Sequence, residues 1–230
     1  MDLTKTAMLK SSAAVLFGLL CLTDVVVPAQ NPSTNDELAA IEQAESANQT
    51  KLSRYTWQET QVISVNGEVV DYRLYSASIG ANGQYHRKLV TESTGQEATF
   101  RPNKKKQLSQ YGPYAQELWE LANQYTSLNN EQLTQAHNRG DIELLRQGDL
   151  SKLAINNYAK PGDSLAMTIN QRTHQPLRVQ AKSYLADLQD AVVIQAEFAE
   201  LPDGSSHVAN AEIDSTSKHL TVKLTNWSYQ

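Results

Sequence analysis

Residues 164–182, SLAMTINQRTHQPLRVQAK, contain the pattern that decides the fold. Apolar residues occupy every second position on both sides of the central RTHQP, at Leu165, Met167, Ile169, Leu177, Val179 and Ala181. A period of two is typical of a strand with one dry face and one wet face. RTHQP has the composition of a turn. The stretch therefore predicts a hairpin in an antiparallel sheet.

The same alternation continues to both sides of this hairpin. It appears at residues 192–198 and 220–224. Nearer the N-terminus, YTWQETQVISV and EVVDYRLYSAS flank Asn66-Gly67, and Asn-Gly between two such runs is the strongest short-range sign of a hairpin. The segment 84–92, QYHRKLVTE, predicts the next strand. The chain as a whole predicts about ten strands, spaced as in a meandering antiparallel sheet.

Two segments are typical of helices. In residues 34–55, Leu38, Ile41 and Leu52 fall on one helical face, and Thr34 with Glu37 has the spacing of a capping box. The second segment is a helical insertion around 113–139, in which Pro113 suits a first turn and Gly140 an end. We expect irregular chain over 93–112, where turn formers and charges show little period.

These elements predict an α+β fold. A long antiparallel sheet accumulates twist and curls, so its dry face becomes concave. The amphipathic helices have apolar residues to lay against that face. We therefore expect one domain over residues 30–230: a strongly curved antiparallel sheet or open half-barrel of about ten strands, with the N-terminal helix and the central insertion covering its concave face.

Residues 1–29 are typical of a cleaved bacterial export signal. Lys5 and Lys10 precede an apolar run over 13–22, and VPA at 27–29 fits the cleavage rule. The run is shorter than the roughly 20 residues that span a bilayer. Cys21, the only cysteine, follows a leucine instead of the small residue that precedes lipid-modified cysteines. We expect a periplasmic or secreted protein without a membrane span after cleavage.

The formal net charge of −5 argues against nucleic acid as a partner. The basic run RPNKKK, residues 101–106, is typical of a solvated loop, with contact to an anionic surface as the alternative. The five histidines have none of the spacings of a zinc site, so no metal and no cofactor are predicted.

PGDSL, residues 161–165, contains the letters that name a family of serine hydrolases. Strand-like sequence lies on both sides of it, and Pro161, Gly162 and Asp163 are ordinary turn residues. We therefore interpret Ser164 as part of a hairpin and assign no catalytic residue.

Aromatic and apolar residues supply the candidate ligand-binding site. Aromatic side chains in such a fold complete the core or line a groove for an apolar ligand. The residues expected to line such a groove are Trp57, Trp119, Leu165, Met167, Ile169, Val192 and Ile194.

The organisation resembles the periplasmic lipoprotein-carrier family, the outer-membrane lipoprotein sorting proteins. LSRYTWQETQVISVNGEVVDYRLY, GANGQYHRKLV and FAELPDGSSHVANAEIDSTSKHLTVKLTNWSY also resemble a group of uncharacterised bacterial exported proteins. The resemblance implies a half-barrel with helices inserted as a lid, and an arginine inside the apolar cavity. No motif of the sequence identifies that arginine.

Three functions remain in competition. The first is a non-catalytic carrier or binding module for an apolar ligand, either an acyl chain or a lipidated partner. The second is a regulatory or structural domain that binds an envelope protein, with its concave face filled by its own side chains. The third, an exported hydrolase, depends on PGDSL alone.

Overall fold

The computed structural model describes residues 34–80, 83–92, 102–126 and 128–230. The predicted export signal, residues 1–29, lies outside these ranges. The described helices are α1 (Thr34–Leu52), α2 (Pro102–Thr126) and α3 (Asn130–Arg139). The described strands are β1 (Thr56–Val65), β2 (Glu68–Ile79), β3 (Tyr85–Glu92), β4 (Ile142–Gln147), β5 (Leu150–Asn156), β6 (Ser164–Asn170), β7 (Pro176–Tyr184), β8 (Ala191–Glu200), β9 (Ser206–Ser215) and β10 (Leu220–Trp227).

The strands form one open antiparallel sheet, as predicted. Its order is β3-β2-β1-β10-β9-β8-β7-β6-β5-β4, so β3 and β4 are the two edges. Every pair is a hairpin along the chain except β1 with β10, which joins the N-terminal strands to the C-terminal ones. Asn66 and Gly67, with φ of 51° and 79°, form the tight turn predicted between β1 and β2.

The predicted period of two is confirmed in the burial of the strands. Leu153 and Ile155 of β5, Met167 of β6 and Ile194 of β8 are buried, whereas the residues between them are largely exposed or half-buried. Leu177 is the exception. A bulge between β6 and β7 pairs Ile169 with Pro176, so Leu177 is the extra residue and lies 40% exposed.

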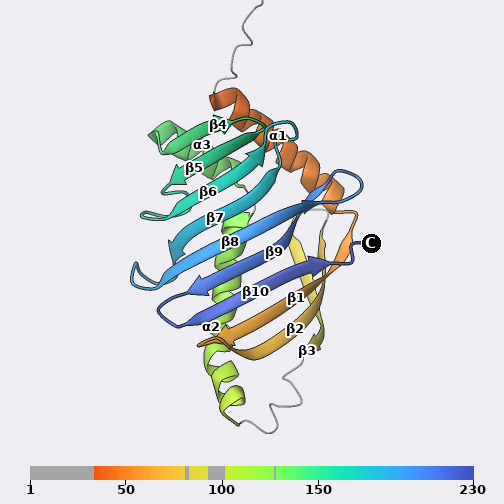
Figure 1. The fold of residues 1–230 in the computed structure, drawn as a ribbon, viewed down its shortest axis with the longest axis vertical. Coiled ribbons are helices and arrows are strands. Elements are labelled where there is room, and N and C mark those ends of the chain that lie inside the picture. Colours follow the sequence, from red (N-terminus) through yellow and green to blue (C-terminus); the bar gives the residue numbers. More distant parts are fainter. Residues whose placement is uncertain (1–33, 81–82, 93–101, 127) are drawn as a thin grey trace, which may run out of the picture. The chain divides into compact units, whose positions relative to one another are not determined.

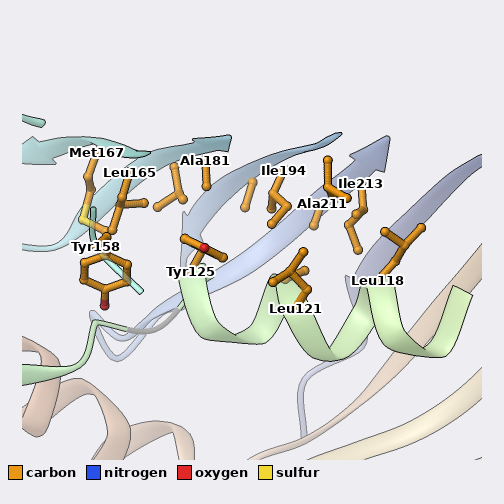
Figure 2. Packing of buried hydrophobic residues seen from close by; sticks show 14 of the residues in the cluster. Leu118, Leu121, Tyr125, Tyr158, Leu165, Met167, Ala181, Ile194, Ala211 and Ile213 are labelled. Carbon is orange, nitrogen blue, oxygen red and sulfur yellow. The ribbon is translucent and has the colours of Figure 1, made fainter. Parts of the chain in front are cut away.

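The helices pack on the dry face of the sheet. α2 crosses it and contacts β2, β7, β8, β9 and β10 (Figure 1). Its apolar side, with Leu118, Leu121 and Tyr125, points towards the buried side chains of the strands (Figure 2). No described helix has both the length and the apolar character that crossing a membrane requires.

α1 is tied to the sheet by polar contacts near both of its ends. Near its start, buried Glu37 accepts hydrogen bonds from Ser151 Oγ at 3.1 Å and from Arg146 at 3.4 Å. Near its end, Asn48 exchanges two hydrogen bonds with the backbone of Ser206, at 2.8 and 2.7 Å. Glu37 therefore joins α1 to β4 and β5. Thr34 is the first described residue of α1, and the capping box with Glu37 stays a prediction.

The prediction of irregular chain over 93–112 is wrong for residues 102–112, and residues 93–101 lie outside the described ranges. α2 begins at Pro102, and Pro113 lies inside it. The segment 103–111, NKKKQLSQY, is rich in strong helix formers and contains no β-branched residue. Its propensity and the contacts of the later turns with the sheet outweigh the hydrogen bond that Pro113 removes.

PGDSL lies in a turn, as predicted. Residues 157–163 connect β5 to β6, and Ser164 is the first residue of β6, paired with Asn156 and Lys182. The Asp163 carboxylate accepts a hydrogen bond from the hydroxyl of Tyr125 in α2 at 2.5 Å. The same carboxylate oxygen also accepts the backbone N–H of Lys160 at 3.0 Å. Asp163 thus fixes the turn against α2.

Candidate functional site: an apolar cavity beneath α1 and α2

A cavity of about 250 Å³ lies between the C-terminal half of α1, the C-terminal part of α2 and the dry face of the sheet. Five aromatic residues line it: Trp57, Tyr85, Trp119, Phe198 and Tyr229. Aliphatic residues complete the wall, among them Leu52, Ala122, Val208, Ala211 and Leu224. The cavity is therefore bounded mainly by apolar side chains, as ligand sites for small apolar molecules are.

The aromatic residues form a continuous wall from β1 to α2. Tyr229 stacks on Trp57 with ring centroids 5.3 Å apart, and Trp57 contacts Tyr85 at 5.9 Å. Tyr85 in turn contacts Trp119 at 5.6 Å. The chain end holds Tyr229 in place, because the backbone of Gln230 pairs with that of Thr56 in both directions. Such ring contacts stabilise the wall in addition to the stabilisation that comes from burying its apolar surface.

A buried ion pair adjoins this wall: Glu59 lines the cavity, and Arg87 is not among the lining residues. Arg87 of β3 donates to Glu59 of β1 at 3.1 Å, and the two side chains are 11% and 3% exposed. The hydroxyl of Tyr85 donates to the other carboxylate oxygen of Glu59 at 2.6 Å. Burial, followed by the nearby charge of Glu59, raises the pKa of Tyr85 well above its ordinary value, so Tyr85 stays a hydrogen-bond donor.

Other groups occupy the remaining surface of the Arg87 guanidinium. Its second terminal nitrogen donates to Gln116 of α2 at 2.9 Å. The rings of Trp119 and Tyr75 cover it, with centroids 3.9 and 4.3 Å from its central carbon. Arg87 therefore links the edge strand β3 to α2 through several contacts at once.

Two further titratable groups line the cavity. Burial raises the pKa of the Glu45 carboxyl in α1, and a hydrogen bond from Gln49 opposes that change. Burial lowers the pKa of the imidazole of His207, whose ring lies 4.2 Å from that of Tyr229. Both groups are thus surrounded by enough protein to disfavour their charged forms. The described residues contain no cluster of three His, Cys, Asp or Glu side chains suited to a metal ion.

The expected ligand-binding residues fall into two groups. Trp57 and Trp119 line the cavity. Leu165, Met167, Ile169, Val192 and Ile194 are buried in the hydrophobic core and are not among the residues that line it. Side chains of the helices, such as Tyr125 and Leu121, cover that part of the sheet (Figure 2).

Sequence reasoning missed Glu59, Arg87 and Tyr85. A signal was present, because Glu59 has the same parity in β1 as the buried Trp57 and Ile63, and a charged residue at an inward position needs a partner. The partner itself lies on β3 and could not be found from spacing. Arg87 contacts the ring of Trp119 and is not among the residues that line the cavity.

No protein-family model matches the chain, and no curated protein matches it. Solved structures with similar folds include a DUF1329 family protein from Desulfovibrio piger, at 11% identity over 84% of this chain and 91% of that one, with a TM-score of 0.37. A LolA superfamily protein from Nitrosomonas europaea is 9% identical over 81% and 92% of the two chains, with a TM-score of 0.32. A chain of the MucA/MucB complex from Pseudomonas aeruginosa is 10% identical over 83% and 93%, with a TM-score of 0.25. Similarity at this level says nothing about the ligand or partner of this chain.

Proposed function

We propose that the protein is an exported, non-catalytic carrier or binding module that holds an apolar chain, free or attached to a partner, in the cavity beneath α1 and α2. The observation that carries the proposal is the cavity itself, about 250 Å³ in volume and walled by five aromatic residues. An unfilled apolar cavity costs packing energy, so it lowers the stability of the fold. Stability alone therefore gives no reason for such a space.

The volume sets the length of chain that fits. An apolar cavity of about 150 Å³ takes up benzene, a six-carbon ring. Scaled by volume, a cavity of about 250 Å³ holds a segment of roughly ten carbons. At ~0.8 kcal/mol for each methylene group removed from water, full burial is worth about 8 kcal/mol before ordering costs. Binding of that strength holds a chain and still allows its release.

Quenching of tryptophan fluorescence tests the proposal. A medium-chain alkyl alcohol with bromine along its chain quenches a tryptophan that it touches. The protein has three tryptophans. Trp57 and Trp119 line the cavity, whereas Trp227 is 48% exposed and does not line it. We expect saturable quenching in the wild type.

The variants identify the site of quenching. Trp227→Phe keeps both reporters in the cavity, so saturable quenching persists. Trp57→Phe combined with Trp119→Phe leaves only Trp227, so saturable quenching disappears. Equal quenching in that double variant, or none in the wild type at concentrations where the alcohol is soluble, overturns the proposal.

A further inference from the structure

The polar side chains that line the cavity restrict which head groups a ligand can have. Glu45 and Glu59 both line the cavity, and its lining contains no lysine or arginine within the described residues. A site for a carboxylate or phosphate normally supplies a cation or a set of free N–H donors. The charged side chains that line this cavity are carboxylates instead.

Arg87 does not supply the missing cation. It stands behind the wall, with one terminal nitrogen on Glu59 and the other on Gln116. Rings of Trp119 and Tyr75 cover its planar group. An anionic head group would therefore have to displace Glu59 or an aromatic ring to reach it.

Glu45 is the second negative group. It lies on α1 and lines the cavity, and it accepts a hydrogen bond from Gln49 at 3.4 Å. Within the described residues, no lysine or arginine pairs with it. A carboxylate ligand would enter beside this acidic group in a space shielded from water, where repulsion is stronger than in solution.

Among the residues that the structure describes, two that line the cavity also have buried hydrogen-bonding atoms without partners. These are the indole N–H of Trp57, a donor, and the side-chain oxygen of Asn226, an acceptor. Asn226 pairs directly with Glu59 across β1 and β10, and Trp57 is two residues from Glu59 on the same face. Protein atoms cover both groups, so a ligand reaches them only if neighbouring side chains move. A head group that both accepts and donates would satisfy them.

We propose that the cavity takes amphiphiles whose polar end is uncharged and can both donate and accept a hydrogen bond, such as an alcohol or a primary amide, and discriminates against carboxylates and phosphates. This rests on the proposed function and narrows its ligand class. The decisive comparison is between an alkyl alcohol and the alkyl carboxylate of the same chain length, titrated into the full chain above the pKa of the free carboxylate. We expect the alcohol to bind more tightly by at least about tenfold, since one like-charge contact at short range in protein exceeds that amount.

Charge reversal at Glu45 gives the matched variant. Glu45→Lys places a cation at the cavity, so carboxylate affinity rises by at least about tenfold, the effect of one short-range charge contact, and alcohol affinity changes far less. Glu42→Lys makes the same change of charge on α1 at a residue that does not line the cavity, and should leave both affinities nearly unchanged.

The outcomes separate the two proposals. If the wild type binds the carboxylate as tightly as the alcohol, or if Glu45→Lys and Glu42→Lys act alike, the head-group inference fails and the carrier proposal stands. If neither amphiphile binds, the carrier proposal fails and the inference falls with it.

Discussion

Removal of the Arg87 side chain should destabilise the protein strongly, because Arg87 and Glu59 form a buried pair. Arg87→Met keeps most of the apolar volume and deletes the cation, leaving the carboxylate of Glu59, 3% exposed, with the hydroxyl of Tyr85. Breaking a buried pair from one side costs about 3–5 kcal/mol. A domain of this size has a total stability of about 5–15 kcal/mol. The melting temperature should therefore fall by roughly 10 °C.

A double-mutant cycle separates the pair from the rest of the packing. The combination of Glu59→Gln and Arg87→Met removes both charges of this pair, and the glutamine side chain can still accept a hydrogen bond from Tyr85. We expect the double variant to be more stable than Arg87→Met alone, with a coupling energy of about 1–3 kcal/mol. Urea denaturation followed by circular dichroism measures all four proteins without depending on Trp119, which lies against Arg87.

An exposed pair of the same chemistry is the control. Arg178 and Glu197 pair across β7 and β8 at 2.8 Å, with both side chains 58% exposed. Arg178→Met should cost less than about 1 kcal/mol. If Arg87→Met costs no more than Arg178→Met, or if the effects in the Arg87 cycle simply add, the reasoning about the buried pair is refuted.

Two further predictions concern the turn at Asp163 and the carboxyl group of Glu45 in α1. Tyr125→Phe removes the hydroxyl that donates to buried Asp163, so urea unfolding should show a loss of about 1–3 kcal/mol; a loss no larger than that of exposed Tyr72→Phe would contradict this. Burial raises the pKa of Glu45 above 4.5, so the folded chain binds that proton more tightly than the unfolded chain does, and stability falls as the pH rises through the shifted pKa. Glu45→Gln should therefore stabilise the protein at neutral pH and not below about pH 4, unlike Glu42→Gln on the same helix, and a gain that does not depend on pH would count against the assignment.

The sheet could be predicted from the sequence because the residues that specify each hairpin lie close together in the chain. Each hairpin has its own alternation and turn residues, as with Asn66-Gly67. The pairing of β1 with β10 lacks any local mark, since the two strands are far apart in the chain. Leu177 shows the limit of the pattern, because a one-residue bulge reverses the face on which an apolar residue lies.

From the sequence, a covered apolar face could be predicted, but the position of the cavity could not. Alternating strands and two helices imply a covered apolar face, but its filling depends on which side chains meet there. Leu165, Ile194 and Leu224 share the same local pattern and all belong to the hydrophobic core, yet only Leu224 also lines the cavity. The difference arises from the path of α2 across the sheet, which no periodicity records.

The dependence of affinity on chain length tests the central claim most directly. Isothermal titration of a series of alkyl alcohols should give a binding free energy that improves by up to ~0.8 kcal/mol per methylene and stops improving near ten carbons, where the cavity is full. Ala122→Phe, which places a ring into the cavity from α2, should move that limit to shorter chains, whereas Ala154→Phe on an exposed position of β5 should not. Affinity that keeps rising beyond this limit, or that is the same for every length, would contradict a bounded cavity as the binding site.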